Sequence, residues 1–239
     1  MSGHSKWATS HRKKELADAK KGAAFTKLAS LITIAAREGG GDLDANFKLR
    51  LAVDKARGAN MPKDNIERAI KKGSGSGKEG PNLEETLYEI IGPLGVGFIV
   101  EAVTDNKNRT VGDLKALLNK NGGQLGGANS VAWNFNRRGV IAVAGRLTDE
   151  TELQLIDAGA SDIEKTEESW RIITPPAELM TVAEKIKKLG LDVQEAALAY
   201  LPNEEITIAQ TEDQERIERL YNLIDDLEDV TNVYTNAAW

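Results

Sequence analysis

The chain has 239 residues, of which 41% are hydrophobic and 28% charged, a balance that suits globular domains with apolar cores. It contains no cysteine, which excludes disulfides, thiolate metal sites and a cysteine nucleophile. The net charge of −6 averages two unlike parts, because residues 1–80 hold 17 Lys+Arg against 9 Asp+Glu while the remainder carries a net charge of −14. This asymmetry indicates a basic, nucleic-acid-binding arm on an acidic body.

No apolar run reaches the length of a signal-peptide core or of a membrane-spanning helix. We therefore expect a cytoplasmic protein without a membrane partner.

Residues 1–79 are predicted to form a basic helical domain. Apolar residues recur every three to four positions across residues 25–36, which predicts a helix that ends at the glycines of 39–41. A similar pattern from Leu49 predicts a second helix that ends near Gly58. None of these segments alternates with the period of a strand.

A third helix is predicted to begin at Pro62, a residue well suited to a first helical position, and to stop at Gly73. The following segment, 73–78, has the composition of a linker and marks a domain boundary. It ends in Gly-Lys like a phosphate-binding loop. However, it follows a helix instead of a strand, and Glu79 stands where such a loop needs Ser or Thr.

After the linker the pattern changes to strands. Residues 88–91 and 96–104 are predicted as strands around a turn, followed by a helix from about Thr110, where Thr110 and Asp113 resemble a capping box. The glycine-rich segment 122–127 lacks the dinucleotide-binding fingerprint, so we interpret it as a flexible connector or a partner contact.

Residues 139–202 predict a compact ferredoxin-like domain with the order βαββαβ. The expected elements are strand 140–143, helix 149–157, strand 162–166, strand 169–174, helix 178–189 and strand 196–200.

The tail of the chain predicts a strand (205–209), a helix (213–227) and a short strand (232–235) that cannot bury their apolar faces alone. We therefore expect 83–135 and 204–239 to form one α+β domain, into which 139–202 is inserted. The predicted fold class is α+β multidomain, with a helical N-terminal domain followed by two α+β domains, the third inserted in the second.

Basic residues at helical spacing are the main functional signal. Lys13, Lys20 and Lys27 lie seven residues apart and so form one stripe on a helix. Clustered cations gain affinity for phosphates by releasing condensed counterions, although a merely solvated charged face gives the same pattern. The predicted nucleic-acid-binding residues are Lys6, Trp7, Arg12, Lys13, Lys14, Lys20, Lys21, Lys27, Lys48, Arg50, Lys55 and Arg57.

Trp7 follows Lys6 and lies three residues after His4, where it either stacks on an unpaired base or folds back onto the helices as an anchor. His4 and His11 are the only histidines. A hydrolytic triad would need one of them, yet both belong to the basic arm, and no cysteine or carboxylate cluster accompanies them. We expect no enzymatic activity, no metal, no cofactor and no small-molecule substrate.

Five long motifs resemble the YebC family. They are GHSKWA, DAKKG followed by FTKL, LRLAVDKARGANMPKDNIERAIKKG, YEIIGPLGVGFIVEAVTDNKNRT and GGQLGGANSVAWNF. The resemblance implies one helical and two α+β domains, the third inserted in the second. The family's basic opening maps onto Lys6, Lys13, Lys14, Lys20, Lys21 and Lys27.

One departure from the family pattern concerns the opening. Where the family usually has Asn-Ile-Lys-His-Arg-Lys, this chain has Thr-Ser-His-Arg-Lys-Lys at residues 9–14. The charge is kept but the histidine is shifted by one position, so no family role is carried over to His11.

The resemblance implies two functional labels. Members are named as probable DNA-binding transcriptional regulators, and eukaryotic relatives as mitochondrial translational activators. A more recent picture places members on the ribosome, in contact with rRNA or tRNA, assisting elongation at difficult stretches such as consecutive prolines. The sequence favours the RNA reading because it shows no helix-turn-helix spacing with a polar recognition helix, and its cations are mostly lysines.

Two further expectations remain. A polar loop on a rigid scaffold commonly carries contacts, so we predict a partner-contact loop formed by Asn106, Lys107, Arg109 and Thr110. A turn held by Asp and Asn side-chain hydrogen bonds explains the same residues without a partner. A protein-only adaptor, in which the acidic body is the binding surface, stays open as a third reading.

Overall fold

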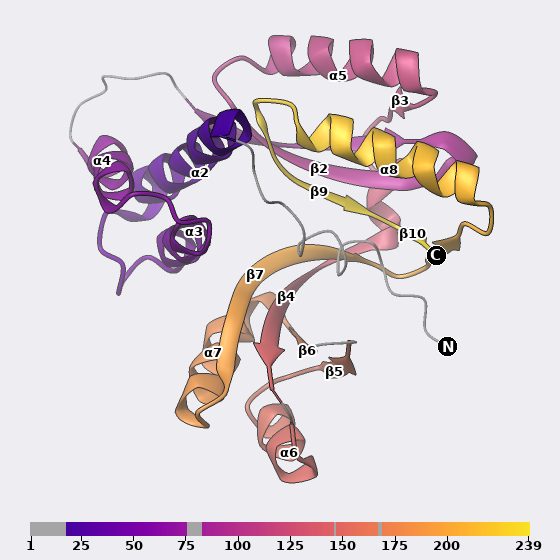
Figure 1. Ribbon diagram of the computed structural model, residues 1–239. Helices are drawn as coiled ribbons and strands as arrows, with labels where there is room; N and C mark the ends of the chain where they lie inside the picture. Colours follow the sequence, from indigo (N-terminus) through magenta and orange to yellow (C-terminus); the bar gives the residue numbers. More distant parts are fainter. Residues whose placement is uncertain (1–17, 76–82, 146, 167–168) are drawn as a thin grey trace. The chain divides into compact units, whose positions relative to one another are not determined.

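The structure is a computed structural model that describes residues 18–75, 83–145, 147–166 and 169–239 (Figure 1). The chain divides into two compact units, residues 1–135 with 202–239 and residues 136–201.

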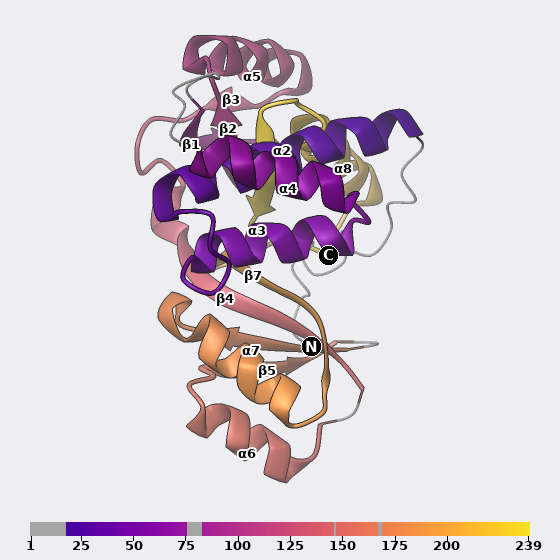
Figure 2. The ribbon, with the colours of Figure 1, turned by 90° about the vertical axis from the view of Figure 1, so that its left-hand side faces the viewer.

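From residue 18, where the description starts, the first unit has the helices α2 (Asp18–Gly39), α3 (Phe47–Gly58) and α4 (Lys63–Ser74), and both α3 and α4 pack against α2 (Figure 2). Their shared core contains Ile32, Leu49 and Val53, each at most 1% exposed. These helices and their order are as the apolar periodicity predicts. The boundary predicted at residues 79–83, between the helical domain and the sheet domain, stays a prediction, because the helices and this sheet belong to the same compact unit.

Two details of these helices differ from the prediction. Pro62 is the residue before α4 and not its first helical position. Gly73 is not the stop, because α4 continues to Ser74. A glycine is required at position 73 for helix packing instead, because a Cβ there would lie 2.3 Å from the carbonyl oxygen of Thr33 on α2. The small residue lets the backbones of α2 and α4 approach each other closely.

A four-stranded antiparallel sheet follows in the same unit, with strand order β3-β1-β2-β9. Helices α5 and α8 pack with it around a core that includes Phe98, Leu114 and Ile217, none of which is exposed. The elements are β1 (Glu84–Ile91), β2 (Gly97–Thr104), α5 (Lys107–Asn121), β3 (Gln124–Leu125), α8 (Thr211–Asp225) and β9 (Val230–Thr235). The tail thus supplies the partner strand that the 83–135 segment lacks.

The start of α5 corrects one prediction. The helix begins at Lys107 and not near Thr110, because the side chain of Asn106 accepts a hydrogen bond from the backbone N–H of Arg109 at 3.1 Å and so caps the helix. Thr110 is buried inside the first turn, so it does not form the expected capping box with Asp113.

The glycine-rich segment 122–127 and the tail also differ from expectation. Residues Gln124–Leu125 form β3, which pairs with β1, so this part of the predicted connector is a sheet edge. The strand predicted at 205–209 is reduced to β8 (Ile206–Thr207), which pairs in parallel with β10 (Ala237–Ala238).

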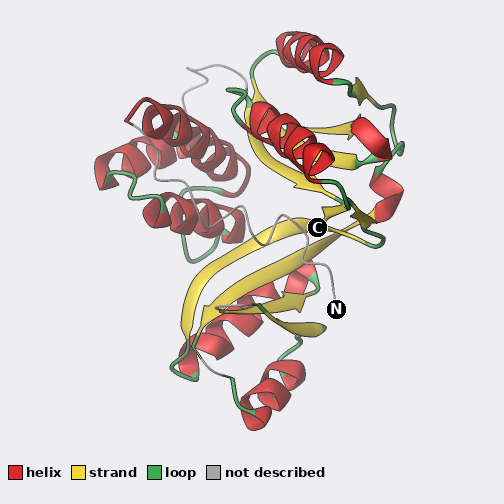
Figure 3. Ribbon diagram, turned by 45° about the vertical axis from the view of Figure 1, so that its right-hand side comes forward, coloured by secondary structure: helices red, strands yellow, loops and turns green. Residues whose placement is uncertain are grey.

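The second unit has the predicted ferredoxin-like topology, with strand order β5-β6-β4-β7 and two helices backing the sheet (Figure 3). Its core includes Ile141, Leu155 and Ile186, none of which is exposed. The elements are β4 (Phe135–Ala144), α6 (Asp149–Asp157), β5 (Asp162–Lys165), β6 (Ser169–Thr174), α7 (Leu179–Lys188) and β7 (Asp192–Pro202). The α+β fold class, with the third domain inserted in the second, is therefore confirmed.

The strands β4 and β7 are longer than the predicted 140–143 and 196–200. The two strands are neighbours in the sheet, β4 in the middle and β7 at the edge. Their backbone pairing extends beyond the apolar residues that mark a strand in the sequence. Over the described ranges, no helix combines the length and the hydropathy that crossing a bilayer requires.

Candidate nucleic-acid interface

The structure describes the side chains of only some of the predicted nucleic-acid-binding residues. Lys6, Trp7, Arg12, Lys13 and Lys14 lie outside the described residues. Lys20 and Lys21 belong to α2, but their side chains are likewise outside the description. The stripe expected from Lys13 through Lys27 therefore stays a prediction. The remaining members are Lys27, Lys48, Arg50, Lys55 and Arg57.

The lysines of this second group are engaged with other parts of their own unit. The Nζ of Lys48 lies 2.8 Å from Oε2 of Glu38 and 2.7 Å from Oε2 of Glu85 on β1. Partial burial lowers the pKa of Lys48, but the hydrogen bonds to the two carboxylates outweigh it and leave the pKa above its ordinary value. The Nζ of Lys55 donates to Oδ1 of Asn232 on β9 at 2.6 Å.

Lys27 likewise donates to the backbone carbonyl of Asp225 at the end of α8. Arg50 donates to the carbonyl oxygens of Leu43 and Asp44 and so fastens the loop before its own helix. The side chain of Arg57 is 63% exposed, against 41% for that of Lys48, and its contact with Asp54 is long at 3.4 Å.

Helix α4 carries a cationic face that the sequence reading missed. Arg68, Lys71 and Lys72 are exposed, and none of the three makes an ion pair or a side-chain hydrogen bond with the residues that the structure describes. Lys71 and Lys72 follow Arg68 by three and four residues, which places all three on one side of the helix. The opposite side, with Ile66 and Ala69, is buried. We call these three residues the α4 face.

A sequence signal for the α4 face was present. The apolar residues of this helix fix which side is buried, so the cations between them must face outward. The density of lysines in residues 6–27 drew the prediction to the chain's opening instead.

The predicted partner-contact loop is held by internal bonds. Lys107 lies 2.5 Å from a carboxylate oxygen of Glu84, and this hydrogen bond raises its pKa. Arg109 pairs with Asp229 at 2.8 Å and with Asp105 at 3.1 Å, and the hydrogen bond to Asp229 raises the pKa of the guanidinium. The cations of this loop are thus committed to neighbouring carboxylates.

Asp229 is the centre of that arrangement. Its side chain is only 12% exposed and accepts hydrogen bonds from Arg109, from the hydroxyl of Thr110 at 2.6 Å and from that of Thr104 at 3.1 Å. Thr104 ends β2, Thr110 lies in the first turn of α5 and Asp229 precedes β9. The network therefore joins three elements and gives the loop a fixed shape.

A second loop, residues 126–134, is fixed around one carboxylate. Glu89 of β1 accepts backbone N–H bonds from Asn129 at 2.6 Å and from Val131 and Ala132 at 2.8 Å each. Partial burial raises the pKa of Glu89, but these hydrogen bonds outweigh it and leave the pKa below its ordinary value. The loop ends with Trp133, whose residue surface is 61% exposed.

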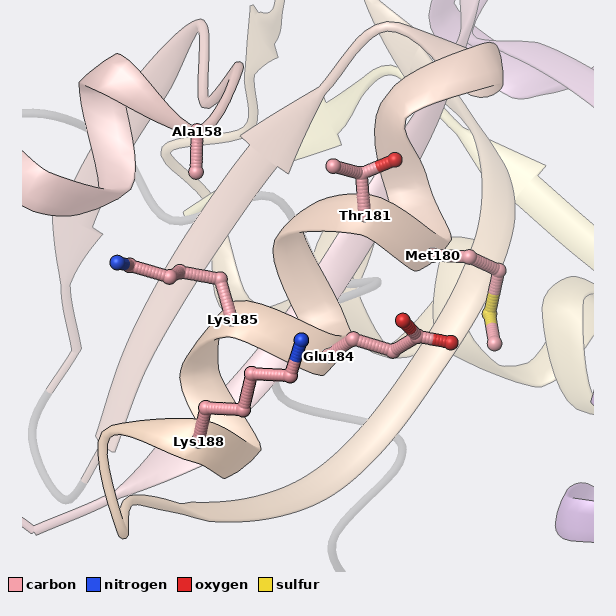
Figure 4. Close-up of a pocket in the computed structure, with 6 residues that line it drawn as sticks. All are labelled: Ala158, Met180, Thr181, Glu184, Lys185 and Lys188. Atoms are coloured by element: carbon pink, nitrogen blue, oxygen red, sulfur yellow. The ribbon is translucent and has the colours of Figure 1, made fainter.

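Two hollows are lined mainly by polar and charged side chains. One, of about 310 Å³, lies on the second unit, where Lys185 and Lys188 extend from α7 (Figure 4). The other, of about 390 Å³, lies between the end of α5 and α8. Neither brings a histidine to a nucleophile, and the described residues contain no group of three or more His, Cys, Asp or Glu side chains suited to a metal. The lining residues of the first are Ala158, Met180, Thr181, Glu184, Lys185 and Lys188.

Comparisons with known proteins cover almost the whole chain. Residues 5–76 match the TACO1/YebC protein N-terminal domain, and residues 83–237 match the TACO1/YebC second and third domain. A protein of Thermoanaerobacter pseudethanolicus is 48% identical over 99% of this chain and 97% of its own length, and one of Thermotoga petrophila is 46% identical over 99% and 93%. Both are named probable transcriptional regulatory proteins.

A solved structure also resembles this one. The crystal structure of a conserved hypothetical protein from Aquifex aeolicus superimposes with a TM-score of 0.86 at 39% sequence identity, covering 98% of this chain and 96% of the other.

Proposed function

Because this chain belongs to the TACO1/YebC family, we propose that it is a non-enzymatic regulator of gene expression that binds nucleic acid through its helical N-terminal part. The observation that carries the proposal is the α4 face, three exposed cations at helical spacing that have no ion-pair or hydrogen-bond partner among the described residues. Such cations are available to phosphates without first giving up a bond within the protein.

The charge distribution also supports binding through the N-terminal part of the chain. Residues 1–80 have an excess of basic over acidic side chains, 17 against 9, while the whole chain is acidic at −6. The acidic remainder repels a polyanion and so confines its contact to the basic part. Nucleic acid is the abundant polyanion whose binding needs only such a surface and no catalytic group.

The names of the relatives support DNA as the target and transcription as the regulated process. A second candidate is a translation factor that binds rRNA or tRNA on the ribosome and assists elongation at difficult stretches such as consecutive prolines. It is favoured by the make-up of α4, whose exposed residues are mostly charged, while its one amide side chain of the type that reads adenine in the major groove, Asn65, is half-buried.

Titration of the full chain with duplex DNA, with single-stranded RNA of the same sequence and with purified ribosomes tests the proposal. For about three phosphate contacts, the log–log slope of affinity against salt should be about −2 to −2.7 for nucleic acid. Affinities that do not change with salt contradict phosphate binding.

The same titration separates the two candidates when competitor is added. Binding to one DNA sequence that survives excess unrelated duplex supports the transcriptional reading. Binding to ribosomes that survives the same excess, without any preferred DNA sequence, supports the translational reading.

A further inference from the structure

We propose that Trp133 is a stacking platform for an unpaired nucleobase, at a site separate from the α4 face. This inference rests on the proposed binding of nucleic acid and adds the chemistry of a second contact. Trp133 belongs to a short 3₁₀ turn, Ala132–Asn134, immediately before β4. With 61% of its surface exposed, it is one of only a few large hydrophobic residues that the described part of the chain leaves in solvent.

Hydrogen bonds to Glu89 of β1 hold the loop that carries Trp133 in a fixed conformation. Three of its backbone N–H groups point at the carboxylate of Glu89, and the hydroxyl of Ser130 lies 3.3 Å from the same group. The backbone N–H of Gly126 also donates to the carbonyl oxygen of Glu89 at 2.7 Å. A charged acceptor with this many donors fixes the loop's conformation before any ligand arrives.

The ring and its neighbours are fixed as well. The indole Nε1 donates to the carbonyl oxygen of Ser130 at 3.2 Å, which restrains the orientation of the ring. The side chain of Asn134 exchanges two hydrogen bonds of 2.8 Å with the backbone of Glu204, and the backbone N–H of Asn203 donates to the carbonyl of Asn134 at 2.7 Å. An aromatic ring held in this way loses little conformational freedom when it binds a partner.

The surroundings of the ring favour a base over the other possible ligands. The carboxylate of Glu89, which is bonded to the backbone of this loop up to Ala132, disfavours a phosphate at this position, whereas the neutral face of a base meets no such repulsion. Besides Trp133, the loop consists of glycine, alanine, serine, asparagine and one valine, Val131, which is buried, so it offers a single aromatic surface and not the contiguous apolar patch that protein interfaces bury. Every base has a π-face that stacks on such a ring.

The test compares full-length wild type, Trp133→Ala and Trp133→Phe for binding to a single-stranded oligonucleotide, its abasic counterpart and a duplex of the same sequence. Stacking on one base predicts that Trp133→Ala weakens single-strand binding about five-fold to 150-fold, whereas Trp133→Phe retains most of the affinity. On the abasic strand and on the duplex, all three proteins should bind alike. Trp239→Ala, which removes a tryptophan that is 42% exposed at the chain's end, is the matched control and should behave as wild type.

Two outcomes overturn the proposal. One is an unchanged single-strand affinity of Trp133→Ala, and the other is an equal loss on the abasic strand, which assigns the effect to the loop and not to a base. Either result leaves the proposed function standing as long as wild type binds in a salt-dependent way. If wild type binds none of the three probes, the proposed function itself fails.

Discussion

The cations of α2 and α3 and those of α4 look alike in the sequence but differ in what they contact. Lys27, Lys48 and Lys55 each bond to a group on the sheet part of their unit, and two of these partners are 177 and 198 residues away along the chain. The α4 face has no such partners among the described residues. Charge along a helix therefore says little about whether a cation is available to a ligand.

The difference has a physical consequence for binding. A phosphate that binds Lys48 must replace two carboxylates that already satisfy it, so the net gain is small. A phosphate that binds the α4 face displaces only water and counterions. We therefore expect engaged charges to contribute to stability and unengaged charges to affinity.

The largest expected effect comes from reversing the α4 face. The variant Arg68→Glu/Lys71→Glu/Lys72→Glu should lose nucleic-acid affinity, and the log–log salt slope should become less negative by about 2 to 2.7 if all three residues contact phosphates. Fluorescence anisotropy across a salt series measures both quantities. The thermal midpoint should change little, because the three side chains are exposed.

The matched control is Lys185→Glu/Lys187→Glu/Lys188→Glu on α7, which makes the same change in net charge elsewhere. Equal loss of affinity in both variants would mean that net charge, and not the α4 face, controls binding.

The second effect concerns an engaged charge. Asp229→Ala removes the carboxylate that the hydroxyls of Thr104 and Thr110 and the guanidinium of Arg109 share, which should lower the free energy of unfolding by about 2–4 kcal/mol. Urea denaturation measures this change, and nucleic-acid affinity should remain at the wild-type value. Asp113→Ala on the exposed side of α5 is the control. A loss no larger than that of the control would show that the network does not stabilise the fold.

Glu89→Gln tests an engaged anion through its pH dependence. The folded-state pKa of Glu89 is lowered, so its stabilisation is present above the ordinary value of 4.5 and is lost as the pH falls through the folded-state pKa. The variant should be less stable than wild type at pH 7 by about 1–2 kcal/mol, and the difference should shrink below pH 4.5. A difference that stays constant with pH in unfolding experiments would exclude a role for the charge.

The smallest effect is expected from Lys48→Met. Its side chain is 41% exposed, so the two ion pairs should contribute less than about 1 kcal/mol to the free energy of unfolding. Nucleic-acid affinity should change less than two-fold, by the argument for engaged cations. An affinity loss as large as that of the α4 variant would contradict the distinction between the two groups.

The success of the sequence reading depended on how local each feature is. The limits of α6 and β6 agree with the predictions, because their caps and apolar patterns are contained within the elements. The start of α5 was misplaced by three residues, since Asn106 and Thr110 are both polar residues found at helix starts, and only the burial of Thr110 separates their roles. The stacking site was missed because Glu89, which holds the loop, is 40 to 43 residues away from its donors.

The sequence by itself determined the helical and strand elements, the need of the tail for a partner sheet and the basic character of the N-terminal part. These depend on period, turn residues and composition, which are properties of neighbouring residues. Only the tertiary structure decided which charges are engaged. Lys55 meets Asn232 and Arg109 meets Asp229 through strand pairing and helix packing, and no local pattern specifies which distant side chain a cation will contact. Trp133 is likewise carried into solvent by a loop that a distant carboxylate, that of Glu89, holds in place.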